Sequence, residues 1–216
     1  ALGETALDAS VSGGNNTAIG KDALTELTSG SSNVAVGVAA LDANTTGAQN
    51  TAIGRNSLTA NTASNDSVAV GYNCLQNNTG AANTAVGSGA MQANTSGVQN
   101  VAVGYVALDA NTTGNENSAF GQSALGNNTT GSSNTALGRS ALKDNTTASN
   151  NTAIGHDALQ ANTTGTSNTA VGANALDAAT TADQNTAVGR DALGANTTGN
   201  VNVAIGDFAI NNSTAA

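Results

Sequence analysis

Only a few side chains in this sequence could carry catalysis, and Cys74 is the first candidate because a thiolate is a strong nucleophile. It is the single cysteine among 216 residues, and no base partner can be named for it. In the repeat described below, the equivalent position is alanine in all of the remaining copies except one. We therefore interpret Cys74 as a small buried hydrophobic residue.

His156 is the second candidate, because it is the only histidine and is followed by Asp157. A His-Asp pair can serve as general base and orienting group. Lys21-Asp22 and Arg190-Asp191 occupy the same place in other copies of the repeat. A solvated charge ladder accounts for all three dipeptides better than a catalytic pair does.

Metal and sugar sites have equally little support. Calcium-binding rolls carry Asp in every turn, whereas the acidic residues here do not recur at one position of adjacent copies. Tyr72 and Tyr105 share a repeat position two copies apart, and two rings are too few for a sugar-stacking platform. The sequence therefore predicts no catalytic, cofactor-binding or metal-ligating residue, and no cofactor.

Several Asn-x-Thr/Ser sequons recur because the turn of the repeat spells one. They include Asn44, Asn111, Asn145, Asn162 and Asn196. We interpret them as turns, with glycosylation left open for a source that glycosylates.

The composition excludes several classes of function. Ala, Asn, Thr and Gly fill 131 of the 216 positions, and Leu, Ile, Val and Phe together number 36, a content typical of disordered chains. The net charge of −9 argues against nucleic acid and against an anionic membrane surface. The longest apolar stretch, from Val34 to Leu41, is far shorter than a membrane span, which needs about 20 residues.

An internal repeat of 17 residues, N-T-A-V-G-x-x-A-L-x-x-N-T-T-G-x-x, runs along the whole chain. A partial copy covers residues 1–15, full copies cover 16–201 and a partial copy covers 202–216, thirteen in all. Only the copy at 67–82 is shortened, by one residue in its turn. We predict a single domain over 1–216, with the repeat register preserved across the deletion.

The repeat predicts an all-β fold, a parallel β-solenoid of about thirteen coils. Each copy is too short for a helical hairpin and ends in the turn-forming cluster N-T-T-G. Two short strands per coil, T-A-V-G and x-A-L-x, would stack on the next coil at about 4.8 Å and form a rod on the order of 60 Å long. Stacking on neighbours fills even a thin core continuously.

Each position of the repeat has a physical interpretation. The fifth is Gly in all thirteen copies, from Gly3 to Gly206, which predicts positive φ or close approach to another coil. The fourth is always a large apolar residue and the ninth is Leu, Met91 or Ile210, so we expect these two to form the aliphatic core. Asn at the first and twelfth positions and Thr at the thirteenth predict structural hydrogen-bonded ladders along the rod.

The third position predicts association. It is Ala in all thirteen copies, and it faces the opposite way from the second and fourth positions of the strand. If Ala points outward, its small size indicates close packing against another surface. If Ala points inward, a row of Val and Ile is exposed as an interaction surface.

The ends of the sequence lead to the same expectation. The chain begins at the third position of a coil and stops at the fifteenth without a polar cap, and open solenoid ends are sticky edges. We expect either an excerpt of a longer array or subunits that continue end to end in a fibre.

The string N-T-A-V-G, as in Asn16 to Gly20, Asn33 to Gly37 and Asn185 to Gly189, resembles the head repeats of trimeric autotransporter adhesins. It resembles still more closely the arrays of phage-type tail fibres and large bacterial surface proteins. The resemblance covers the whole chain. It implies a left-handed parallel β-roll, assembled as a parallel homotrimer whose inner faces pack on the axis, and an extracellular role as stalk or adhesive head.

We therefore predict a non-enzymatic structural or adhesive fibre protein, located outside the cell, at the cell surface or on a virion. Its expected partner is itself, as a homotrimer or an end-to-end filament, and a host or surface receptor is left open. The alternative is an ice-binding solenoid that uses rows of Thr. A polysaccharide-acting enzyme on the same fold would need clustered carboxylates or basic residues, which the repeat does not provide.

Overall fold

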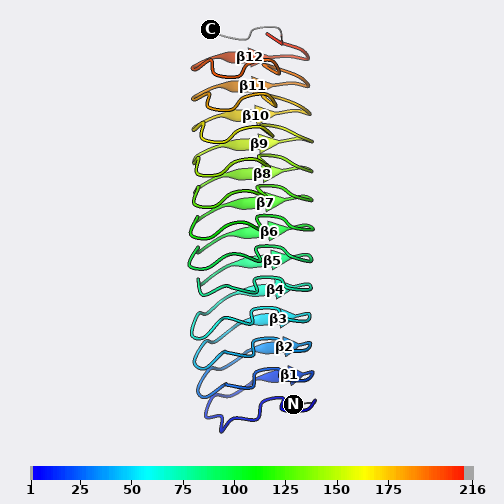
Figure 1. The fold of residues 1–216 in the computed structure, drawn as a ribbon, viewed down its shortest axis with the longest axis vertical. Helices are drawn as coiled ribbons and strands as arrows, with labels where there is room; N and C mark the ends of the chain where they lie inside the picture. The colour runs from blue at the N-terminus through cyan, green and yellow to red at the C-terminus, as the bar shows by residue number, and fades with distance from the viewer. Residues whose placement is uncertain (1, 212–216) are drawn as a thin grey trace.

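The computed structural model describes residues 2–211, which form a straight stack of coils with one short strand per coil (Figure 1). The strands are β1 (Thr17–Ile19), β2 (Val34–Val36), β3 (Thr51–Ile53), β4 (Val68–Val70), β5 (Thr84–Val86), β6 (Val101–Val103), β7 (Ser118–Phe120), β8 (Thr135–Leu137), β9 (Thr152–Ile154), β10 (Thr169–Val171), β11 (Thr186–Val188) and β12 (Val203–Ile205). They make one twelve-stranded sheet in chain order. The predicted all-β parallel solenoid is confirmed.

Strand pairing is parallel and aligns equivalent repeat positions, as in Ala18 with Ala35. The shortened copy keeps this alignment, since Val68 of β4 pairs with Thr84 of β5. The first copy adds only an isolated bridge between Leu2 and Ile19, so twelve rather than thirteen copies contribute a strand to the described sheet.

The second predicted strand, x-A-L-x, is wrong, because this segment is a turn in each coil. Its Leu adopts left-handed φ values, 54° at Leu24 and 53° at Leu108. That conformation costs an L-residue roughly 1–2 kcal/mol. Complete burial of the Leu side chain contributes about 1.5–3 kcal/mol in return. The Leu24 N–H also donates to the Ala40 carbonyl of the next coil at 3.1 Å. The turn is therefore stable although the residue type does not favour it.

The aliphatic core is predicted correctly at the ninth position and wrongly at the fourth. Ala at the third position is buried in every strand, so the fourth residue points out of the coil, as in β3, where Ala52 is buried and Ile53 is exposed. The core instead combines the Ala of the third position with the Ala and Leu of the eighth and ninth, such as Ala107 and Leu108. Asn of the first and twelfth positions completes the buried interior.

The Gly of the fifth position meets both expectations. Gly104 has a φ of 141°, which L side chains rarely adopt, and a Cβ added there would collide with the carbonyl of Gly121 in the next coil. Of the residues that the structure describes, none belongs to a helix long and apolar enough to span a bilayer.

Candidate interaction surface

The outer face of the sheet carries a continuous band of apolar and threonine side chains, which we name the sheet stripe. It consists of the second and fourth residues of each copy, the outward-pointing residues of β1 to β12. Aliphatic side chains in the middle of the rod remain well exposed, 38% at Val86 and 48% at Leu137. The sequence left open whether Ala or the Val and Ile row faces outward, and the structure decides for the Val and Ile row.

The stripe is extended and regular. Twelve strands at about 4.8 Å spacing give a face about 55 Å long, and with its borders it is about 15 Å wide, on the order of 800 Å². This area includes the polar borders and the threonine hydroxyls, but the second and fourth residues hold no charged side chain from β1 to β12, and large exposed apolar patches are rare on monomers and mark interaction sites. The sheet stripe is therefore the candidate functional surface of this chain.

Two exposed ridges border the stripe, because the chain turns a corner on each side of the strand. The seventeenth-position ridge lies before the strands, and its residues have positive φ, between 57° at Glu116 and 63° at Asn15. It comprises Asn15, Ser32, Gln49, Asp66, Ala82, Gln99, Glu116, Ser133, Asn150, Ser167, Gln184 and Val201. The sixth-position ridge lies after the strands, beyond the invariant Gly. It comprises Glu4, Lys21, Val38, Arg55, Tyr72, Ser88, Tyr105, Gln122, Arg139, His156, Ala173, Arg190 and Asp207.

The sixth-position ridge holds most of the side chains that are suited to recognition. Seven of the eight Lys, Arg, His and Tyr residues of the chain lie on it, and only Lys143 lies elsewhere. The fold does not require a charged or aromatic residue at the sixth position, since other coils have Ser88 and Ala173 there. Arg and Tyr are enriched at protein interfaces. Their concentration in one repeat position was readable from the sequence, but its place beside the stripe was not.

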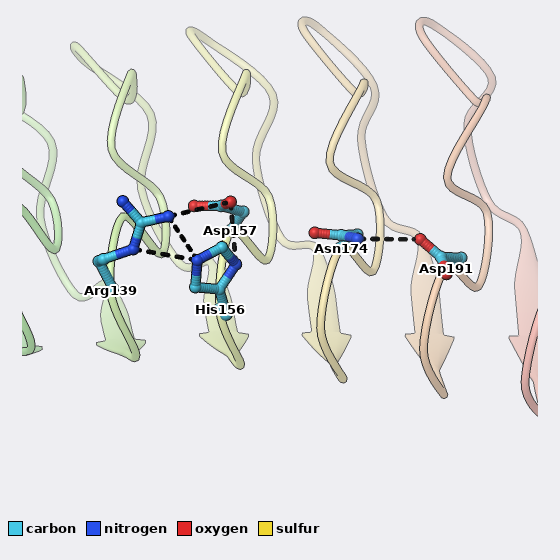
Figure 2. Close-up of polar contacts among 5 residues, drawn as sticks. All are labelled: Arg139, His156, Asp157, Asn174 and Asp191. Carbon is cyan, nitrogen blue, oxygen red and sulfur yellow. Dashed lines mark hydrogen bonds and ion pairs between the residues drawn. The ribbon is translucent and has the colours of Figure 1, made fainter.

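His156 and Asp157 do come together, in a contact that also includes Arg139 (Figure 2). His156 Nδ1 lies 2.9 Å from Asp157 Oδ2, and Arg139 Nε donates to His156 Nε2 at 3.0 Å. Arg139 Nη2 also lies within hydrogen-bond distance of His156 Nε2. In this geometry the Arg139 guanidinium occupies the ring nitrogen that a general base would turn toward a nucleophile.

Other charged groups of the ladder bond between coils. Lys21 lies 3.4 Å from Glu4 in the preceding coil, and Arg190 lies 2.9 Å from Asp207 in the following one. This hydrogen bond and the positive charge hold the pKa of Asp207 below its ordinary range. Figure 2 also shows the seventh position, where the Asn174 amide donates to Asp191 at 3.1 Å.

The predicted Asn ladders run through the interior and serve structure. At the first position, Asn33 donates from its side chain to Asn16 Oδ1 at 3.2 Å and to the Gly47 carbonyl at 2.8 Å. At the twelfth, Asn111 donates to Asn94 Oδ1 at 2.7 Å. The Thr ladder is confirmed as well, since the Thr112 hydroxyl donates to the Thr129 carbonyl at 2.9 Å.

The sequon asparagines belong to the twelfth-position ladder. All five are buried, and each uses its Nδ2 to donate to a carbonyl three residues later, as Asn44 does to Gly47 at 3.0 Å. Glycosylation attaches at this nitrogen, so the folded coil withholds it. The interpretation of these sequences as turns is confirmed.

Cys74 is fully buried, as predicted, and its thiol donates to the Ala85 carbonyl at 3.3 Å. Burial raises the pKa of the Cys74 thiol to about 12, which keeps it protonated at neutral pH. Within residues 2–211 no pocket is found, and no three His, Cys, Asp or Glu side chains are placed to hold a metal ion.

Comparison with known proteins adds no relative: no family model, no curated protein and no solved structure matches the chain.

Proposed function

We propose that this chain is a non-enzymatic structural shaft of an extracellular fibre and that it associates with copies of itself through the sheet stripe. The observation that supports this is the continuous outward row of Val, Ile, Leu and Phe along the sheet, in which exposed residues such as Ile53 and Leu137 are interspersed with partly exposed ones such as Val70 and Val103. An isolated rod has no need of an apolar exterior, and one copy offers an area close to the roughly 800 Å² per partner of a stable interface. A homotrimer packed through the stripe is the assembly we expect, and an end-to-end filament, joined through terminal coils instead of the stripe, is the alternative.

The adhesive role and the location at a cell or virion surface rest on the resemblance to adhesin heads and tail fibres. In such a fibre the repeated coil supplies length and stiffness, because every coil hydrogen-bonds to the next. Binding to a host or surface receptor would then use residues exposed on the assembled shaft.

The assembly state tests the proposal. We expect light scattering to give a multiple of the chain mass and electron microscopy to show discrete rods or filaments. Val86→Lys places a charge on the stripe and should raise the concentration needed for association by at least about tenfold, because the charge would have to be buried. Thr113→Lys, on an exposed turn away from the sheet, is the matched control. A wild-type chain that stays monomeric at all concentrations would overturn the proposal.

One observation favours a second candidate, ice binding. Strands β8 to β11 present Thr135, Thr152, Thr169 and Thr186 in register on the outer face, each two residues from an aliphatic side chain. Such a regular array of hydroxyl and methyl groups can order water. Thermal hysteresis of the monomeric Val86→Lys and wild-type proteins distinguishes the two functions, and a clear effect would put ice binding first.

A further inference from the structure

The sheet stripe alone cannot specify how two copies align. Its residues repeat every coil, so sliding one rod past another by one coil replaces each stripe contact with a nearly identical one. Register in periodic β-structure has to come from an aperiodic feature. The sixth-position ridge is such a feature, since it changes in size and charge from coil to coil along the border of the stripe.

Symmetry determines which ridges meet when two stripes pack face to face. If the rods are antiparallel, each ridge meets its own counterpart, sixth against sixth and seventeenth against seventeenth. If the rods are parallel and related by an axis along their length, the sixth-position ridge of one copy meets the seventeenth-position ridge of the other. Such contacts between different surfaces close into dimers or trimers by rotation.

Charge favours the parallel arrangement. The sixth-position ridge carries four of the five cations and two acidic residues, Glu4 and Asp207, so it is net positive. The seventeenth-position ridge, in contrast, carries Asp66 and Glu116 and no cation. In an antiparallel pair the acidic ridges would face one another. In a parallel pair each basic ridge faces an acidic one, and charge complementarity of this kind selects orientation and register.

Three ridge residues, Arg55, Tyr72 and Tyr105, are free to bind a partner. Lys21, Arg139 and Arg190 are engaged by acidic residues of their own chain. Arg55 makes no ion pair with any residue from 2 to 211, and Tyr72 and Tyr105 are more than half exposed.

From this arrangement we propose that Arg55, Tyr72 and Tyr105 form the specificity edge of the interface, and that Arg55 pairs with Asp66 of a second, parallel copy of this chain. The proposal rests on the proposed self-association and adds its register and polarity. Arg55 follows β3 and Asp66 precedes β4, so in aligned copies they lie one coil apart, about 4.8 Å along the rod, within reach of an arginine. A slip of several coils separates them.

The pairing has to be intermolecular. Within one chain the two residues lie on opposite borders of the stripe, about 15 Å apart, too far for an ion pair. A charge exchange that restores association can therefore act only between copies.

The test compares the full chain with Arg55→Glu, Asp66→Arg and the double variant, in sedimentation equilibrium at low and physiological salt. Each single variant should raise the midpoint concentration for association about tenfold, and the double variant should return it to within about threefold of wild type. Lys143→Glu makes the same charge change away from the stripe and should shift the midpoint less than twofold. Circular dichroism confirms that each variant is folded.

The outcomes separate this proposal from the one it rests on. If the wild type never associates, both fail. If it associates and the single variants behave like Lys143→Glu, or the double variant is no better than the singles, the pairing is wrong while self-association stands. Cross-linking between cysteines placed at positions 55 and 66 of differently tagged copies should succeed for a parallel pair, and its failure in a folded, associated sample would overturn the pairing.

Discussion

At the scale of single residues, the stability of the rod depends on buried amides that are bonded from coil to coil. In the twelfth-position ladder, Asn145 and Asn162 are joined by a hydrogen bond of 2.9 Å. The ladder then stops, because the next coil has Ala179 in this place. Asn162 Oδ1 is buried and accepts no hydrogen bond from the described residues. An unsatisfied buried acceptor costs about 1–3 kcal/mol.

Ala179→Asn should continue the ladder and stabilise the protein. The new amide can donate to Asn162 Oδ1 and to the Ala182 carbonyl, as the asparagines of neighbouring coils do at equivalent places. We expect the free energy of unfolding to rise by about 1 kcal/mol, measured by urea denaturation. Ala178→Asn, one residue earlier and partly exposed, is the control and should be nearly neutral. A loss of stability in Ala179→Asn beyond that of the control would contradict the ladder interpretation.

At the scale of the structural element, the sequence predicted those features of the coil that require a particular residue type. Gly104 follows from an invariant column, and Asn111 from a known ladder geometry. The direction of the strand was not predicted, because Ala102 and Val103 are both apolar and alternation permits either phase. The turn at Leu108 was missed because Leu has no intrinsic preference for positive φ, and only the packed interior makes that conformation favourable.

The candidate surface was predicted in the same partial way. Exposure of the Val and Ile row was one of two stated alternatives. The relation between Arg55 and Asp66 was not accessible, since it depends on which corners of the coil flank the strand. Those corners are formed by residues with positive φ at the seventeenth and seventh positions. The residue types found at these positions do not predict that conformation.

Asp109 and Asp177, which are partly buried at the tenth position of their coils, should destabilise the fold at neutral pH. Burial raises the pKa of Asp109. Burial, followed by the charge of Asp191, raises the pKa of Asp177. A carboxyl group whose pKa is raised on folding lowers the free energy of unfolding when the pH is above the pKa of the folded state. This loss disappears when the pH falls below the pKa of the same group in the unfolded chain.

Asp177→Asn should therefore stabilise the protein at pH 7 and have little effect near pH 3. Asp109→Asn should act in the same direction, and because the two residues lie four coils apart, their effects should add. Asp207→Asn should act in the opposite direction. Arg190 lowers the pKa of Asp207, so the charged carboxylate contributes a little stability at neutral pH, and the substitution removes it. Thermal unfolding from pH 3 to 7 measures all three. Equal effects of Asp177→Asn at both ends of the range would contradict the assignment.

At the scale of the whole molecule, the coils form a one-dimensional array. The strands pair only with their immediate neighbours, from β1 to β12. Stability in such a solenoid is the sum of coil terms and of the interfaces between adjacent coils. A defect at one level should therefore weaken one interface and divide the rod, whereas in a globular core it would lower the stability of the whole.

Gly104→Ala tests this at the centre of the rod. The alanine would have to adopt a φ near 141° while its Cβ meets the Gly121 backbone, so we expect a loss of about 3 kcal/mol at the interface between β6 and β7. Hydrogen exchange should show protection lost first at β6 and β7 and retained in the outer coils, and urea unfolding should become broad or biphasic. Gly14→Ala, where an added Cβ meets nothing, is the control. A uniform loss of protection from β1 to β12 would mean that the stack unfolds as one cooperative unit, and that the free energy of the shaft is not divided coil by coil.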